Sequence, residues 1–368
     1  MKKKKWIIMT CVLVLFIAML SVGVYLFSRQ TYNKVEILNT YTESASDNSS
    51  YIYFAKGVLK YSRDGVALFS KKGEELWNQS CQIQSPMVEI CGNTAVLGDK
   101  GGTAVMVLTK EGKKGEFQTS RPIEKLTVSS QGIVGAVLKD ETTPRIVCYD
   151  AKGEILVEQK TSLVNTGYPL DVSISKDGKT LLVSYLCANE NSVSTRVAYY
   201  NFDGEIADHE VATAAYSDSF IPTVAYLNQS TSVLVGDKVL VFWQGTKKPE
   251  EKVKIDIDKE IKSVAYDEEK VALVLKNKEK SGYELRVYNT SGKQLLSKTF
   301  DGEYGNIKIS GRKVILYEGN QCLIINMAGV VRYNGKMDVT IQEMYSILGI
   351  DRYMVVSPEG MQKVQLTK

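Results

Sequence analysis

The single histidine of this 368-residue chain, His209, is the only residue that could act as a catalytic imidazole. A histidine and carboxylate pair would have to use it, and a histidine-rich metal cluster is excluded. His209 stands between two acidic residues, in a stretch typical of an exposed turn at a strand end. We therefore expect a solvated side chain and no catalytic role for His209.

Five cysteines follow the N-terminal segment, and an odd number cannot all pair within one chain. Three of them, Cys148, Cys187 and Cys322, fall in apolar strand-like runs, where a free thiol packs like a small apolar side chain. Cys81 and Cys91 are the one pair that could form a disulfide, and the sequence leaves this open. Their separation does not fit a zinc site, so we expect no metal.

The chain has 42 aspartates and glutamates, and two of them from distant segments could form the carboxylate pair of a glycoside hydrolase. Most stand in polar turns, where a solvated charge is the ordinary role of such residues. No glycine-rich phosphate loop precedes a helical pattern, since Gly101-Gly102 lies between two strand-like runs. Hydrolysis by paired carboxylates remains an alternative that depends on which carboxylates meet at the centre of the fold.

Aromatic residues in polar connections are the best candidates for binding, because aromatic side chains are enriched where proteins contact partners. Tyr168, Tyr216, Phe220 and Tyr304 occupy such positions, and the long connection from residue 212 to 222 is where we most expect a ligand surface. Tyrosines inside apolar runs should instead pack between sheets: Tyr149, Tyr199 and Tyr288.

Short strands must position these residues, because after residue 30 the chain consists of alternating or β-branched runs separated by Gly, Asn and Asp, without an amphipathic helix. One unit recurs: an apolar strand, a polar turn that ends in glycine, and a second strand. Its turn glycines are spaced 37 to 51 residues apart: Gly73, Gly112, Gly153, Gly204, Gly245, Gly292 and Gly329. This period matches a four-stranded propeller blade of roughly 40 to 50 residues.

The repeat predicts an all-β fold, an eight-bladed β-propeller. Seven complete blades are expected near residues 51–79, 85–120, 123–162, 168–213, 221–257, 261–300 and 304–338. The eighth has three strands, at 344–348, 352–357 and 361–366, and lacks the outermost one, which residues 34–38 could supply. Pairing the two ends of the chain in this way removes exposed sheet edges. Seven blades are the alternative if residues 51–54 are not an independent inner strand.

Two segments carry a resemblance to known propellers. The segment from Phe69 to Trp77 resembles the repeat of quinoprotein-like eight-bladed propellers, and the segment from Ser175 to Leu181 is similar to turns of WD40-like propellers. The layout of the whole chain resembles an uncharacterised family of membrane-anchored propellers in Gram-positive bacteria. The resemblance implies a fold and a location and no assigned chemistry. Quinone enzymes of that superfamily imply repeated docking tryptophans, but beyond Trp6 the chain has only Trp77 and Trp243, so we expect no cofactor.

Residues 6–27 form an uncharged run of 22 residues, long enough as a helix to cross a bilayer core of roughly 30 Å. Four lysines precede it, which places the N-terminus in the cytoplasm and the remainder outside. An uncleaved single-pass transmembrane helix is expected, and a cleaved signal peptide with a poor site at Ser21-Val22-Gly23 is the alternative. The predicted divisions are a cytoplasmic and membrane segment (1–29), a linker with the ring-closing strand (30–50) and the propeller (51–368).

The charge of the chain beyond the anchor is close to zero, since the first 29 residues hold five of the 46 basic residues and none of the 42 acidic ones. No stretch gathers enough Lys and Arg to bind phosphate backbones, so we expect no nucleic acid partner. We expect a non-catalytic module that binds a protein or a cell-envelope polymer through loops on one face. An envelope glycan hydrolase with carboxylates near the propeller axis is the alternative.

Overall fold

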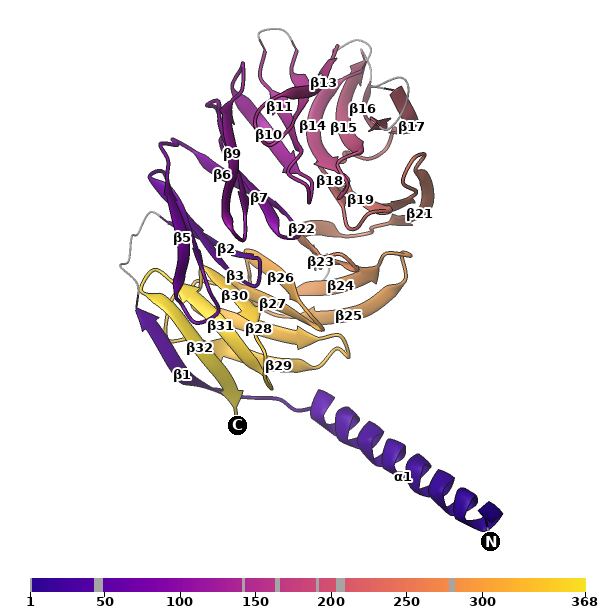
Figure 1. Ribbon diagram of the computed structural model, residues 1–368. Helices are drawn as coiled ribbons and strands as arrows, with labels where there is room; N and C mark the ends of the chain where they lie inside the picture. The colour runs from indigo at the N-terminus through magenta and orange to yellow at the C-terminus, as the bar shows by residue number, and fades with distance from the viewer. Residues whose placement is uncertain are drawn as a thin grey trace.

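The computed structural model describes residues 2–42, 49–140, 143–162, 166–189, 192–202, 209–277 and 282–368. Within these ranges, the side chains of 2–5, 7, 8, 10–12, 21, 24, 42, 189, 192 and 209 also lie outside the description. The chain begins with helix α1 (Lys2–Ser28), which leads away from a ring of β-sheets (Figure 1). Within the described part of the chain, no helix meets the length and apolarity needed to cross a membrane.

The described strands form eight four-stranded antiparallel sheets arranged around a centre (Figure 1). Blade 1 contains β2 (Ser50–Phe54), β3 (Gly57–Tyr61), β4 (Gly65–Phe69) and β5 (Glu75–Ser80). Blade 2 contains β6 (Pro86–Cys91), β7 (Thr94–Asp99), β8 (Ala104–Thr109) and β9 (Gly112–Gln118). Blade 3 contains β10 (Ile123–Val128), β11 (Val134–Leu138), β12 (Arg145–Tyr149) and β13 (Ile155–Lys160). Blade 4 contains β14 (Tyr168–Ile174), β15 (Thr180–Asn189), β16 (Ser192–Asn201) and β17 (His209–Tyr216).

The second half of the ring follows the same plan. Blade 5 contains β18 (Thr223–Tyr226), β19 (Thr231–Val235), β20 (Val239–Gln244) and β21 (Glu250–Asp256). Blade 6 contains β22 (Glu260–Tyr266), β23 (Lys270–Lys276), β24 (Tyr283–Asn289) and β25 (Gln294–Phe300). Blade 7 contains β26 (Asn306–Ser310), β27 (Lys313–Glu318), β28 (Gln321–Asn326) and β29 (Val331–Lys336). Blade 8 contains β30 (Glu343–Ser346), β31 (Arg352–Ser357), β32 (Gly360–Thr367) and, as its outer strand, β1 (Lys34–Thr42).

The ring closes between the two ends of the propeller sequence. β1 pairs antiparallel with β32, from Lys34 opposite Thr367 to Thr42 opposite Gly360. This confirms the prediction that the segment after α1 supplies the missing outer strand. The seven-blade alternative is wrong, because β2 is the inner strand of a complete blade 1.

The turn glycines of the repeat are needed for two reasons. Those that the structure describes have positive φ, which glycine adopts without strain: Gly73, Gly112, Gly153, Gly245, Gly292 and Gly329. In addition, the turns press on the preceding blade: a Cβ at Gly73 would lie 2.6 Å from the Cβ of Tyr41, and one at Gly153 would lie 2.5 Å from that of Phe117. Several turn glycines of the repeat therefore lie where one blade contacts the preceding one. Gly204 lies outside the described residues.

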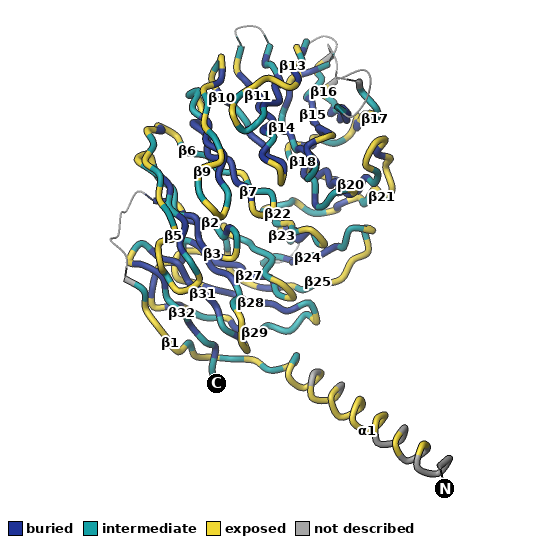
Figure 2. Tube along the Cα trace, in the orientation of Figure 1, coloured by how far each residue is buried: buried dark blue, intermediate teal, exposed yellow. Residues whose placement is uncertain are grey.

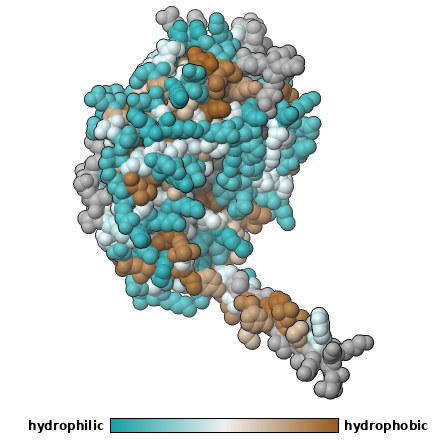
Figure 3. Space-filling model, viewed as in Figure 1, coloured by the Kyte–Doolittle hydropathy of each residue, from teal (hydrophilic) through white to brown (hydrophobic). Residues whose placement is uncertain are grey.

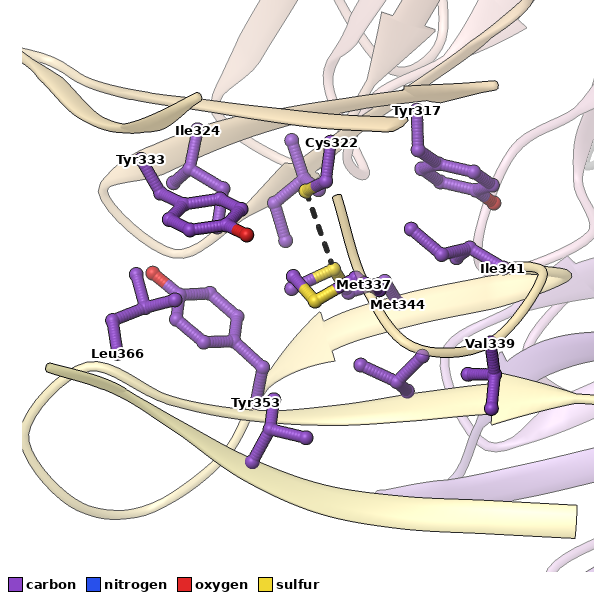
Figure 4. Packing of buried hydrophobic residues seen from close by; sticks show 13 residues of the cluster. Tyr317, Cys322, Ile324, Tyr333, Met337, Val339, Ile341, Met344, Tyr353 and Leu366 are labelled. Carbon is purple, nitrogen blue, oxygen red and sulfur yellow. Dashed lines mark hydrogen bonds between the residues drawn. The ribbon is translucent and has the colours of Figure 1, made fainter. Parts of the chain in front are cut away.

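The hydrophobic core lies between neighbouring blades. One cluster joins blades 7 and 8, where Cys322 donates to Met344 Sδ at 3.6 Å and Tyr333 and Tyr353 pack beside the two sulfur atoms (Figure 4). The other clusters join further pairs of neighbours, and the predicted packing tyrosines are buried in them: Tyr149, Tyr199 and Tyr288. Outer strands alternate between exposed and half-buried positions, whereas the second and third strands are mostly buried (Figure 2).

The disc has two faces because successive strands of a blade run in opposite directions. One face carries the turns from first to second and from third to fourth strand. The other carries the turns from second to third strand and the connections from each fourth strand to the next blade. α1 enters the outer strand of blade 8 and so joins the first of these, which we call the junction face. We call the opposite one the connection face.

Candidate functional site

All four predicted binding residues come from connections between blades, so the topology places them on the connection face. Tyr168 begins β14 and is 37% exposed, with its hydroxyl donating to Glu124 Oε2 at 2.8 Å. Phe220 precedes β18 and is 41% exposed, and its backbone N–H donates to Asp237. These two residues have the accessible aromatic surface that the sequence predicts.

Tyr216 and Tyr304 differ from that expectation. Tyr216 ends β17 and is buried, donating to Glu251 at 2.6 Å and accepting from the Trp243 indole at 3.2 Å. The connection predicted from residue 212 to 222 is shorter than expected. Strand β17 continues to Tyr216, which pairs with Thr195, so only residues 217–222 connect β17 to β18. Tyr304 is half-buried against Phe300, with ring centroids 6.0 Å apart. The prediction of an exposed loop tyrosine is therefore wrong for Tyr216, which is a core residue.

A pocket of about 540 Å³ opens on the connection face at blades 2, 3 and 4, and we call it the Tyr168 pocket. Its volume is in the range of ligand sites. The lining comes from the starts of inner strands and from neighbouring turns: Ser85, Lys100, Gly101, Pro122, Ile123, Glu124, Lys125, Lys139, Tyr168, Pro169 and Leu170. Of the four predicted residues, Tyr168 alone lines this pocket.

The charge of the Tyr168 pocket is predominantly positive, since three lysines and one glutamate line it. Lys100 and Lys139 are exposed, and neither forms an ion pair within the described chain. Asp140, next to Lys139, already pairs with Arg121 and Arg145, each at 2.8 Å. Sequence reasoning missed these lysines because they are far apart along the chain and only blade packing gathers them.

The inner strands bring further charges together near the axis, where neighbouring inner strands contact one another. Lys125 Nζ of β10 lies 3.5 Å from Asp171 Oδ1 of β14. Glu89 of β6 faces the same charges: enclosure by protein raises its pKa to about 7, Asp171 adds to the rise, and Lys125 opposes it. The Glu89 side chain is nevertheless reachable by solvent, as expected for a residue that lines an open axis.

Asp171 is one of several side chains that accept hydrogen bonds from backbone N–H groups of a neighbouring inner strand. An innermost strand has an unpaired backbone edge at the axis, and unpaired N–H groups are costly when removed from water. Asp171 accepts from the N–H of Val224 at 3.0 Å, and Ser173 accepts from that of Tyr226 at 2.9 Å. The same relation, from one blade to the next, recurs at three other places: Thr127 with Ile174, Ser310 with Ser346, and Glu343 with Tyr53. These carboxylates therefore have structural partners.

The other residues with chemical potential have structural surroundings. Cys81 and Cys91 are both free, so the pairing that the sequence left open is absent, and Cys148 and Cys322 are buried as predicted, whereas Cys187 is half-buried. Trp77 donates its indole N–H to the carbonyl of Lys110. His209 is the first residue of β17, and its side chain lies outside the description. Among the described residues, no group of three metal-ligating side chains gathers.

Among the described residues, the charged side chains at the junction of α1 with the propeller are the most deeply buried. Arg332 of β29 is 1% exposed and donates to the carbonyls of Phe27 at 2.6 Å and Gln30 at 2.8 Å, while Asn326 donates to that of Ser28 at 2.6 Å. Arg332 also pairs with Asp351, which accepts from Lys313 at 2.8 Å. The last carbonyls of a helix lack partners within it and favour nearby cations. Blade 7 thus caps the end of α1.

Solved structures of the same fold have low sequence identity to this chain. BamB from Moraxella catarrhalis matches with a TM-score of 0.52 and 13% identity, over 91% of this chain and 98% of that one. A eukaryotic initiation factor matches with 0.55 and 10%, over 86% and 84%. Kluyveromyces lactis Hsv2p matches with 0.51 and 11%, over 79% and 98%. At these identities the likeness shows the fold alone.

Sequence comparison goes further than the fold. No curated protein matches the chain. A family model described as a family of unknown function, DUF5711, matches residues 28–366, a range that reaches from the end of α1 into the last strand of blade 8. The chain therefore belongs to the DUF5711 family.

Proposed function

We propose that this protein is a non-catalytic binding or scaffold module, held outside the cell at the membrane by residues 6–27, which recruits a partner protein to its connection face. The observation that carries the proposal is a difference in charge pairing and exposure between the two faces. At the junction with α1, the buried Arg332 donates to the carbonyl of Phe27 and pairs with Asp351. The connection face instead presents the exposed rings of Tyr168 and Phe220 and a pocket in which Lys100 and Lys139 have no ion pair within the described chain. Such a pocket with few convergent polar groups is the default binding site of a propeller without catalytic groups.

The membrane anchor is supported by the sequence and exposure of α1. Its run from Trp6 to Phe27 is uncharged and preceded by four lysines. Its described apolar side chains lie open to solvent, among them Leu15 at 67% and Met19 at 74%, and Figure 3 shows hydrophobic residues gathered along the helix. Large exposed apolar surfaces of this kind mark contact with lipid or protein. The Gram-positive source implied by the resemblance remains a prediction.

The position of α1 has a consequence for the partner. Since the anchor joins the junction face, the connection face lies on the opposite side of the disc. A partner that docks there meets no obstruction from the helix end. Binding residues often lie on loops that a rigid scaffold positions, and the connection face presents loops of this kind.

A site-specific crosslinking experiment tests the proposal. A photoreactive phenylalanine is placed at Phe220 or at Leu170 on the connection face, and at Lys72, in the third turn of blade 1 on the junction face, as the matched control. We expect a discrete adduct in intact cells from the two connection-face positions and none from Lys72. Adducts from Lys72 alone, or none from any position, would contradict the proposal. Protease access to the propeller from outside intact cells tests its location.

A second candidate function, glycan hydrolysis at the axis, is favoured by one observation. Glu89 has a pKa near 7, as a general acid requires, and the Asp171 carboxylate is close enough to influence it. The backbone N–H of Val224 and the ammonium of Lys125 already engage Asp171, which argues for a structural role. Release of reducing sugars from purified cell-wall glycan by the wild-type protein, abolished by Glu89→Gln, would favour the hydrolase over the scaffold.

A further inference from the structure

We infer that the Tyr168 pocket binds an acidic, partly apolar peptide segment of the partner protein. The inference rests on the proposed function and adds to it the chemistry of the contact. Three features of the described residues carry it: an excess of positive charge, an apolar and aromatic wall, and a tyrosine ring and a turn that are held in place before binding.

Two of the three lysines that line the pocket have no ion-pair partner within the described chain, whereas Lys125 pairs with Asp171. Lys100 extends from the turn between β7 and β8, and Lys139 from the turn after β11, and neither has an ion pair within the described chain. Asp99, which precedes Lys100 in the chain, accepts from the N–H groups of Gln84 and Ser85. A cleft with an excess of one sign of charge attracts ligands of the opposite sign. The ligand should therefore be anionic.

The wall of the pocket distinguishes a peptide from a phosphate polymer. Pro122, Tyr168 and Leu170 present apolar atoms beside the lysines. A peptide offers both carboxylates and apolar side chains to such a surface, whereas a polyphosphate or polyol phosphate chain offers charge without apolar groups.

Part of the binding surface is held in place before a ligand arrives. The Tyr168 hydroxyl donates to Glu124, which holds the ring in place and leaves the side chain 37% exposed. Gly101 N–H donates to the carbonyl of Ile123 at 2.8 Å, and the N–H of Lys100 donates to that of Ser85 at 2.9 Å, so the turn that carries Lys100 is tied to its neighbours. The Tyr168 ring and this turn therefore lose little conformational freedom when a ligand binds.

Fluorescence anisotropy with the full chain in lipid nanodiscs tests the inference. The probe is a labelled short peptide of alternating glutamate and leucine. Comparison ligands are the same peptide with lysine for glutamate, a glutamate and serine peptide, and short-chain polyphosphate. We expect the glutamate and leucine peptide to bind more tightly than the others, with an affinity that falls as salt rises.

The variant Lys100→Glu/Lys139→Glu should weaken that binding by roughly tenfold or more, because two attractive charges become repulsive. The matched control is Lys72→Glu/Lys152→Glu, which reverses two exposed lysines of third turns on the junction face. It should bind like wild type. Circular dichroism confirms that both variants fold. Equal binding by the two variants, or binding of polyphosphate in preference to the peptide, would overturn the inference.

Failure of the inference can be told apart from failure of the proposed function. If crosslinking maps a partner to the connection face and Lys100→Glu/Lys139→Glu captures it as well as wild type, the acidic segment is wrong and the scaffold function stands. If the peptide binds in a manner that depends on the two lysines and no position yields a crosslinked partner, the pocket chemistry is upheld and the scaffold function fails.

Discussion

Charged side chains gather at the junction of α1 and in the Tyr168 pocket, but at the junction they are buried and paired, whereas in the pocket two of them are exposed. At the junction, Arg332 and Asp351 are 1% and 3% exposed, and hydrogen bonds to carbonyls, a lysine and a tyrosine surround the pair. In the pocket, Lys100 and Lys139 are exposed and unpaired within the described chain. Buried charges are tolerated only when paired, whereas unpaired charges at a surface remain available to a ligand.

This contrast separates structural from functional use of the same chemistry. The Arg332 guanidinium lies 5.1 Å from the Phe27 ring centroid and 5.0 Å from that of Tyr32, so it packs as well as pairs. Its removal should damage the structure. Removal of the pocket lysines should damage binding and leave the structure intact.

Arg332→Met should produce the largest loss of stability. The substitution removes one of the positive charges that pair with the buried Asp351, and it removes two hydrogen bonds to carbonyls at the end of α1. Breaking a buried ion pair typically costs about 3–5 kcal/mol. Chemical denaturation of the full chain in detergent measures the free energy of unfolding. Spin labels on α1 and blade 7 should also show a broader distance distribution.

The matched control for that variant is Arg312→Met, which removes an exposed arginine from a turn of the same blade on the same face. We expect its free energy of unfolding to stay within about 0.5 kcal/mol of wild type. Similar losses in the two variants would contradict the structural role of Arg332.

Asp351→Asn should have a smaller effect that depends on pH. Burial raises the pKa of Asp351, but hydrogen bonds from Lys313 and Tyr32 and the nearby positive charges outweigh it, so the pKa is below its usual 3.8. The amide keeps an acceptor oxygen, and Asn tolerates the positive φ of 47° at this position. A carboxyl group whose pKa is lower in the folded than in the unfolded state stabilises the fold at pH values above its unfolded pKa. This stabilisation is lost as the pH falls through the folded pKa.

The stability difference between wild type and Asp351→Asn should therefore be constant near neutral pH, at roughly 2 kcal/mol, and shrink below about pH 3.8. Thermal unfolding at a series of pH values measures it. A difference that does not change with acid would refute the assignment of charge at the junction.

Glu89→Gln should raise the free energy of unfolding, whereas Asp351→Asn should lower it. The pKa of Glu89 is raised to about 7, so the folded state holds its proton more tightly than the unfolded state does. Ionisation therefore destabilises the wild type progressively from about pH 4.5 to pH 7, and the variant should be more stable at pH 8 and equal to wild type at pH 4.5. Solvent access reduces the gain to about 1 kcal/mol or less. Thermal unfolding of both proteins at the two pH values measures this.

The propeller could be predicted from the sequence because its determinants are local and repeated. The glycine turns recur at blade length, and the three-strand remainder after residue 338 showed that the outer strand must come from elsewhere in the chain. Both features follow from turn geometry and edge pairing, which the order of residue types along the chain encodes.

The candidate site could be predicted only in part. Tyr168 was identified because it stands in a polar connection, but Tyr216 stands in a similar context and is buried, since its hydroxyl finds Glu251 and Trp243 in the next blade. The junction was missed altogether: Arg332 and Phe27 are 305 residues apart, and no spacing rule links them. Contacts between blades depend on the ring closing, which residue order alone does not reveal.

Lys100→Gln/Lys139→Gln should have the smallest effect on the fold and therefore sharpens the contrast with Arg332. Neither ammonium pairs with a carboxylate in the described chain, so their removal breaks no structural contact. It also relieves repulsion among the three lysines of the pocket. We expect the free energy of unfolding to be unchanged or higher by a few tenths of a kcal/mol. Chemical denaturation beside Arg332→Met measures the difference, and a loss above about 1 kcal/mol would assign the lysines to the structure rather than to a ligand.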